Sequence, residues 1–111
     1  MSLLFLGLTS LVHAKGPGDQ GFKKLTGGQI RAAFVGKVFS DGTHFSNRYK
    51  ADGTIEGVSM GKKILNKWKI TKDTLCIADS RDELCYAVWI KGKEVKLVYE
   101  DSDVVLDGTL K

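Results

Sequence analysis

Two cysteines that lie close together, Cys76 and Cys85, constrain this chain more than any other feature of its sequence. They fall within the stretch from Trp68 to Trp89, which holds both tryptophans and the clearest signal for a β-hairpin. A disulfide between them would join two antiparallel strands and fix the pairing of the residues around it. The pairs that follow are Leu75 with Tyr86 and Ile77 with Leu84, and residues 79–82 are left as the turn.

This pairing also sorts the apolar residues of the hairpin. Side chains alternate between the two faces of a strand, so Val88 joins the four paired residues on one apolar face and the cysteines point to the other. A slip by one residue would scramble this arrangement. We therefore expect a disulfide that stabilises a small domain by about 2–3 kcal/mol, through its effect on the unfolded chain. The alternative is a pair of unrelated free thiols.

Residues 1–14 contain an apolar run from Leu3 to Val12, followed by His13 and Ala14. An apolar run that ends in a small residue is typical of a secretory signal peptide. The run is too short for a transmembrane helix, which needs about 20 apolar residues. A buried first strand is the structural alternative. Export would place the cysteines where disulfides form, so we expect a periplasmic or secreted protein that is not integral to the membrane.

The rest of the chain predicts one domain. Residues 15–24 are rich in glycine and predict a flexible mature amino terminus, and residues 25–111 predict a single β-barrel-like domain. Basic side chains outnumber acidic ones up to residue 72, and acidic ones outnumber basic ones after it. Either the two parts are neighbours whose strands attract each other, or the basic part forms a face for an anionic partner.

One helix is predicted, between residues 25 and 36. Thr26 and Gln29 have the spacing of a capping box, and Ile30 and Phe34 lie on one helical face. After this helix the apolar residues alternate with polar ones, which indicates strands. The clearest alternating runs are residues 43–50, 63–71 and 94–100.

Short turn signals separate the strands, and none of the gaps has room for a crossover helix. We therefore predict a mainly β fold in which roughly seven or eight antiparallel strands follow the helix in sequence order. Such a meander buries its apolar face most simply by closing into a small up-and-down barrel, which also removes edge strands. The turn signals are Asp41-Gly42, Asp52-Gly53, Gly61, Lys72-Asp73, Ser80-Arg81-Asp82, Lys91-Gly92-Lys93 and Asp101-Ser102-Asp103.

Two asparagines interrupt the apolar faces of their strands. Asn47 lies between two aromatic residues of its strand, and Asn66 lies two residues before Trp68. Polar groups that point inward need hydrogen bonds, and in barrel pockets they orient a ligand among apolar walls. We therefore predict Asn47, Asn66 and Trp68 as interior ligand contacts. The alternative is that the asparagines bind backbone at a strand bend or hold a buried water.

Three lysines, Lys63, Lys67 and Lys69, alternate with apolar residues along one strand. Their positions predict a basic outer surface, which attracts anions over about 10 Å at moderate salt. We predict these lysines as partner-binding residues, with a protein or an anionic envelope component as the partner. Nucleic acid is not expected as a partner after export. The alternative is an ordinary solvated face.

The sequence predicts no catalytic residues, no metal ligands and no cofactor. His44 is the single histidine beyond residue 14 and falls on the polar side of its strand, which favours a surface role over that of a catalytic base. No cluster of cysteine and histidine has zinc spacing once the cysteines are paired. Carboxylates gather at residues 79–83 and 100–103, in turns where aspartate serves the backbone; a calcium site is the alternative there.

Several short elements in order along the chain also carry a resemblance. They are Leu25-Thr26, Ile30, Gly36-Lys37, Asp52-Gly53-Thr54, Trp68-Lys69-Ile70, Leu75-Cys76 and Cys85-Tyr86. Together they are similar to a family of small exported alphaproteobacterial proteins known as a domain of unknown function. The family pattern has a glycine two places before the tryptophan, where this chain has Asn66. The resemblance implies a periplasmic, single β domain with a hairpin disulfide, and it implies no activity.

These observations predict a protein that works by binding and not by catalysis. A binding or inhibitor module, akin to the periplasmic lysozyme inhibitors, would need an exposed loop that carries the contact. A barrel that carries a small ligand would need an interior cavity near the two asparagines. An enzyme would need His44 or a pair of carboxylates set in a cleft.

Overall fold

The computed structural model of the protein describes residues 16–111, so the predicted signal peptide, residues 1–14, lies outside the described residues. The helical elements are η2 (Pro17–Gln20), a 3-10 turn, and α1 (Gly27–Phe34). The strands are β2 (Lys23–Lys24), β3 (Val38–Ser40), β4 (Phe45–Tyr49), β5 (Thr54–Ser59), β6 (Lys62–Thr71), β7 (Thr74–Ala78), β8 (Glu83–Lys91), β9 (Glu94–Tyr99) and β10 (Val105–Leu110). None of the helices in residues 16–111 has the length and apolar character needed to cross a membrane.

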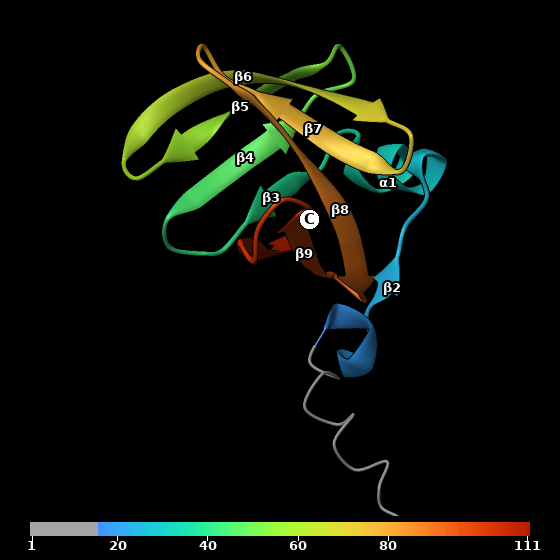
Figure 1. Cartoon of the computed structure of the whole chain (residues 1–111). Coiled ribbons are helices and arrows are strands. Elements are labelled where there is room, and N and C mark those ends of the chain that lie inside the picture. The colour runs from blue at the N-terminus through green and yellow to red at the C-terminus, as the bar shows by residue number, and fades with distance from the viewer. Residues whose placement is uncertain (1–15) are drawn as a thin grey trace, which may run out of the picture.

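Strands β3 to β10 form a closed antiparallel barrel, and β2 adds an extra strand beside β8 (Figure 1). Each barrel strand pairs with the next along the chain, and β3 and β10 close the ring. The predicted mainly β fold, with one short helix before an up-and-down barrel, is therefore confirmed. Every predicted turn signal lies between two of these strands, except that Lys91 is the last residue of β8.

The hairpin pairing predicted from the cysteines is also confirmed. The observed pairs of β7 and β8 include Leu75 with Tyr86, Cys76 with Cys85, and Ile77 with Leu84. Cys76 and Cys85 form a disulfide. Leu75 and Val88 are fully buried on the inward face, whereas Leu84, near the tip of the hairpin, is 39% exposed. The apolar face is therefore covered by the core over most of the hairpin but not at its tip.

The predicted capping box begins helix α1. The Thr26 side chain accepts from the Gln29 amide, and the Thr26 amide donates to the Gln29 side chain at 2.9 Å. At Gly27 a Cβ atom would overlap the carbonyl oxygen of Lys72, and the Gly27 amide donates to Asp73 Oδ1 at 2.8 Å. Glycine at this position therefore lets the start of the helix pack directly on the β6–β7 turn.

Helix α1 covers one end of the barrel (Figure 1). An aromatic cluster packs beneath it. Ile30 and Phe34 are fully buried, and the Phe34 ring meets the Tyr49 ring edge-on at 4.9 Å. Trp68 follows at 5.5 Å from Tyr49, and its indole N–H donates to the Lys50 carbonyl at 2.9 Å. Burial, and then the charge of Tyr86, raises the pKa of Tyr49.

The segment before the helix differs from the prediction. Residues 15–24 were expected to form a flexible amino terminus, but η2 and β2 give residues 17–20 and 23–24 regular structure. Lys23 pairs with Ile90 and Lys24 with Trp89, beyond the point where β7 stops pairing with β8. The long strand β8 thus leaves part of one side open, and β2 fills it. Two consecutive lysines carry no apolar alternation, so the sequence pattern could not indicate this strand.

Candidate functional site

The barrel has one end covered by α1 and one open end. The strands are antiparallel and consecutive, so the turns β3–β4, β5–β6, β7–β8 and β9–β10 all lie opposite α1. In Figure 1 the β3–β4 and β5–β6 turns point away from the helix. The carboxylates on the turns at the open end are Asp41, Asp79, Asp82, Glu100, Asp101 and Asp103. The end covered by α1 carries mostly lysine: Lys23, Lys24, Lys50, Lys72, Lys91 and Lys93.

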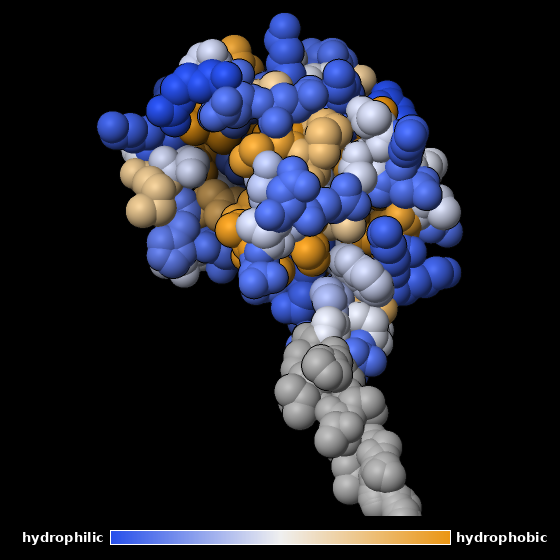
Figure 2. All heavy atoms as spheres, viewed as in Figure 1, coloured by the Kyte–Doolittle hydropathy of each residue, from blue (hydrophilic) through white to orange (hydrophobic). Residues whose placement is uncertain are grey.

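A cavity of about 230 Å³ lies inside the barrel toward the open end. Pockets for drug-sized ligands measure roughly 300–1,000 Å³, so this cavity suits a smaller molecule. Its walls are mostly apolar and aromatic, and include Phe39, Phe45, Tyr49, Ile55, Leu97 and Leu106. The interior is therefore filled beneath the helix and hollow near the open end. On the outside, Figure 2 shows apolar surface across the middle of the molecule, between hydrophilic side chains.

Asn47 lines this cavity and carries a buried hydrogen-bond acceptor. Its Oδ1 atom has no hydrogen-bond partner among the described residues. Asn47 pairs across the sheet with Gly57, where a Cβ atom would overlap both the Asn47 Oδ1 and the Ser46 carbonyl oxygen. Glycine at position 57 therefore makes the space for the asparagine amide. An unpaired buried acceptor costs about 1–3 kcal/mol, and a donor that reached this oxygen would remove that cost.

Asn66 lines the same cavity from β6, so two of the three predicted interior contacts meet there. Strand β5 lies between them and pairs Gly57 with Asn47 and Ile55 with Asn66. Trp68 does not join them, because it lies beneath α1, is only 5% exposed and uses its N–H on the Lys50 carbonyl. The alternating pattern shows which face of the strand a residue occupies, but it does not show how far along the barrel axis the residue lies.

Two further polar residues, Ser59 and Tyr86, line the cavity and were not among the predicted contacts. Burial, and then the charge of Tyr99, raises the pKa of Tyr86, and the two rings lie 5.9 Å apart. The Tyr86 hydroxyl therefore stays protonated at neutral pH and can both donate and accept. The pairing set by the disulfide already placed Tyr86 on the inward face. The hydroxyl group of this tyrosine could have identified it as a polar contact of the interior.

The three predicted partner-binding lysines all lie exposed on the outer face of β6. Lys69 Nζ lies 3.5 Å from a carboxylate oxygen of Glu83, whereas Lys63 and Lys67 form no ion pair with any other described residue. Between those two lysines, Leu65 is 70% exposed. An outer groove of about 480 Å³ runs past Leu65 and Lys63. This face of the barrel thus combines unpaired positive charge with an exposed apolar side chain.

His44 lies at the open end, where its Nδ1 is 2.7 Å from Asp41 Oδ2. Partial desolvation raises the pKa of Asp41. Hydrogen bonds from the amides of the turn and from the His44 ring have the larger, opposite effect, and they hold the pKa of Asp41 well below its usual range. The pair therefore organises the β3–β4 turn. Within the described part of the chain, no serine hydroxyl forms a hydrogen bond with the imidazole.

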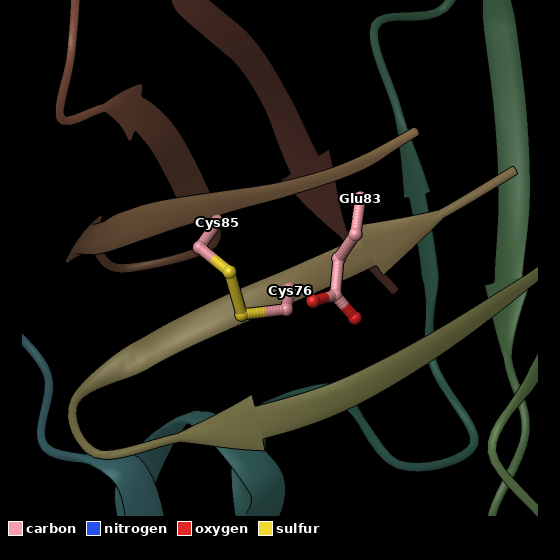
Figure 3. Close-up of side chains that lie close together, drawn as sticks. All are labelled: Cys76, Glu83 and Cys85. Atoms are coloured by element: carbon pink, nitrogen blue, oxygen red, sulfur yellow. A yellow bond between two sulfur atoms is a disulfide. The ribbon is translucent and has the colours of Figure 1, made fainter. Parts of the chain in front are cut away.

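Glu83 lies beside the disulfide (Figure 3). Within residues 16–111, Cys76, Glu83 and Cys85 form the one group of three side chains of metal-ligand type that meet closely. Metals bind the cysteine thiolate, and here each sulfur is bonded to the other. Glu83 faces Lys69 instead. This group is therefore a structural disulfide with a neighbouring ion pair.

Asp79, one of the carboxylates predicted to serve the backbone of its turn, does so, and Asp52 does the same in another turn. The Asp79 carboxylate accepts from the amides of Arg81 and Asp82, and these hydrogen bonds lower the pKa of Asp79. The Asp52 carboxylate accepts from the hydroxyl and the amide of Thr54, which lowers its pKa in the same way. Both aspartates are used locally, to shape the turns.

The chain matches no family model, no curated protein and no solved structure. The similarity to an exported domain of unknown function therefore remains a prediction. The candidate site is defined by the geometry of the open end, where a small apolar cavity with an unpaired acceptor lies beneath acidic turns.

Proposed function

We propose that the protein is a non-catalytic binding protein, and that its cavity holds a small, neutral, mostly apolar molecule that donates one hydrogen bond. The observation that supports this is the buried Asn47 Oδ1 without a partner, set in a cavity with aromatic walls. Burial of apolar surface supplies the affinity, at roughly 25 cal/mol per Å², and the single acceptor fixes the orientation. The carboxylates of the open end disfavour an anionic ligand.

Phenol and toluene test this proposal, because they have nearly the same shape and differ in one donor. We expect phenol to bind more tightly than toluene by about tenfold, the effect of one hydrogen bond to a buried acceptor. The measurement is an NMR titration that follows the side-chain amides of Asn47 and Asn66. A ligand outside the cavity would move neither signal, and that result would reject the site.

Two matched variants assign the acceptor. Asn47→Leu keeps the volume but removes the oxygen, so it should reverse the preference in favour of toluene. Asn66→Leu changes the other asparagine of the cavity and should retain the preference for phenol. The Asn47→Leu variant should also be more stable than the wild type by about 1 kcal/mol, because it removes an unpaired buried polar group. A loss of stability would indicate that Asn47 holds a structural water instead.

The outer face of β6 supports a second binding role, toward an anionic component of the envelope or an acidic protein. Lys63 and Lys67 carry charges that no described carboxylate neutralises, and they flank the exposed Leu65. Replacing Lys63, Lys67 and Lys69 with glutamate should weaken binding to vesicles of anionic phospholipid by about 1 kcal/mol for each lysine. The measurement is co-sedimentation at low and at high salt, with zwitterionic vesicles as the comparison.

A matched variant separates this face from net charge. Glutamate at Lys24, Lys93 and Lys111 makes the same change of charge away from β6. Equal weakening by both triple variants would mean that overall charge, and not the β6 face, controls binding.

We also propose that the protein acts outside the cytoplasm, in the periplasm or after secretion. The sequence supports this with the apolar run that ends at Ala14. The disulfide supports it more weakly, because disulfides persist mainly in oxidising compartments. The similarity to the exported family points the same way.

A further inference from the structure

The barrel is not closed along its whole height. Strand β10 runs over Val105–Leu110, but β3 runs only over Val38–Ser40, and the two pair at Leu110–Phe39 and Thr109–Ser40. Pairing stops there because the chain turns away after Ser40. The Ser40 hydroxyl accepts from the Gly42 amide and donates to the Phe45 carbonyl, which fixes that turn. The first part of β10 is therefore left without a neighbour on this side.

The backbone alternation shows which groups are free. The Lys111 amide donates to Val38 of β3, and the Leu110 amide donates to Lys93 next to β9. Odd-numbered residues of β10 thus direct their N–H and C=O groups toward β3, and even-numbered residues direct theirs toward β9. The groups of Val105 and Asp107 therefore face a side where the described chain provides no strand. This part of β10 is therefore a free strand edge in the wall of the barrel.

The free edge borders a groove and carries apolar side chains. A groove of about 480 Å³ lies beside it, between β10 and the β3–β4 turn, and Asp107, Gly108 and Asp41 line it. Val104 is 52% exposed and Val105 is 40% exposed at the start of the strand. Unpaired strand edges with exposed β-branched side chains accept an added strand, and proteins normally cover or charge them.

The charges around the edge indicate what kind of strand fits. Three acidic residues, Asp41, Glu94 and Asp107, and one basic residue, Lys111, lie along the groove. The turn that leads into β10 adds further carboxylates, Glu100, Asp101 and Asp103, so acidic groups remain in excess. Lys96 neutralises Asp107 at 2.6 Å. A second copy of this chain would bring the same acidic turn and the same edge, so the two would repel each other. A segment with basic side chains would be attracted.

We propose that the free edge of β10 binds an extended, basic segment of a partner protein, which adds a short strand beside Val105–Asp107. Main-chain hydrogen bonds to Val105 and Asp107 hold the segment in register, and its lysine or arginine side chains meet the carboxylates of the groove. Leu106, between these two residues, also lines the cavity, but the edge binds through the backbone groups of Val105 and Asp107, so separate experiments test the two proposals.

The test uses a peptide of alternating lysine and valine, with blocked ends, and amide hydrogen exchange read by NMR. In the free protein the amides of Val105 and Asp107 should exchange faster than those of Leu106 and Gly108, which face β9. Saturating peptide should slow exchange at Val105 and Asp107 by about tenfold or more, since paired edge amides become protected. A peptide of alternating glutamate and valine should give no protection.

Two sets of variants locate the contact. Val105→Pro removes one edge N–H, which proline tolerates at an edge, and should abolish protection at Asp107, whereas Val105→Thr should retain it. If Val105→Pro lowers the melting temperature, the double variant Asp101→Lys, Asp103→Lys replaces it, and we expect weaker binding of the basic peptide with the edge intact. Equal protection by both peptides, or slow exchange at Val105 and Asp107 in the free protein, would overturn the proposal. Protection that rises with protein concentration alone would assign the edge to a second copy instead.

Discussion

Phe34→Ala should lower the free energy of unfolding by about 3–5 kcal/mol, the usual cost of removing a fully buried phenylalanine ring. Phe34 is fully buried where α1 closes the barrel, and its ring meets Phe39 at 6.0 Å and Tyr49 at 4.9 Å. These neighbours belong to strands that cannot move inward without breaking their pairing, so the space would remain a cavity. The measurement is equilibrium unfolding in denaturant, followed by far-ultraviolet circular dichroism.

Phe22→Ala is the matched control, because it removes the same side chain from the surface. Phe22 is half-buried and contacts the ammonium groups of Lys91 and Lys96 at 5.9 and 5.2 Å from its ring centroid. Loss of such exposed cation–π contacts should cost about 1 kcal/mol or less. Similar losses for the two variants would contradict the view that α1 is a structural plug of the barrel.

Reduction of the disulfide should lower the free energy of unfolding by about 2–3 kcal/mol on the chain-entropy model. The cysteines face each other in paired strands, so the native hairpin should keep its hydrogen bonds when the sulfurs separate. The stabilisation therefore acts mainly on the unfolded chain. Unfolding curves with and without reductant measure this effect, and Cys76→Ala with Cys85→Ala should match the reduced protein.

Export can be tested by measuring the intact mass of the protein purified from the envelope fraction. We expect a chain that begins at Lys15 and has no thiol that reacts with an alkylating agent. Full-length protein in the cytoplasm, with Cys76 and Cys85 both alkylated in the folded state, would contradict both the export proposal and the stabilising role of the bond.

Local sequence rules predicted much of this fold. The cysteine spacing fixed the register of β7 and β8, and the capping box at Thr26 and Gln29 placed the start of α1, because both features depend on residues that are near in sequence. The inward positions of Asn47 and Asn66 followed from period-two alternation, and the structure places both in one cavity.

Features that depend on distant contacts were not predicted. Trp68 was expected in the cavity, but the helix determines which end of the barrel is filled, and the helix docks through a contact between Gly27 and Asp73. Gly57 makes room for the Asn47 amide, yet a lone glycine in a strand indicates only that something approaches closely. The free edge of β10 arises from where the β3–β4 turn bends, which no local pattern of β10 reveals.

The closure between β3 and β10 also has a consequence for how the barrel forms and opens. All other neighbouring strands of the barrel are joined by short turns, so each hairpin brings only near residues together, whereas this one contact joins the two ends of the barrel sequence. Its loop-closure entropy is the largest in the barrel, and few residue pairs offset it. The pairing of β3 with β10 is therefore the weakest contact between neighbouring strands of the barrel. It should form last during folding and open first in the native state. Early hydrogen exchange at the Lys111 amide, which donates to the Val38 carbonyl, would report that opening while the rest of the domain stays folded.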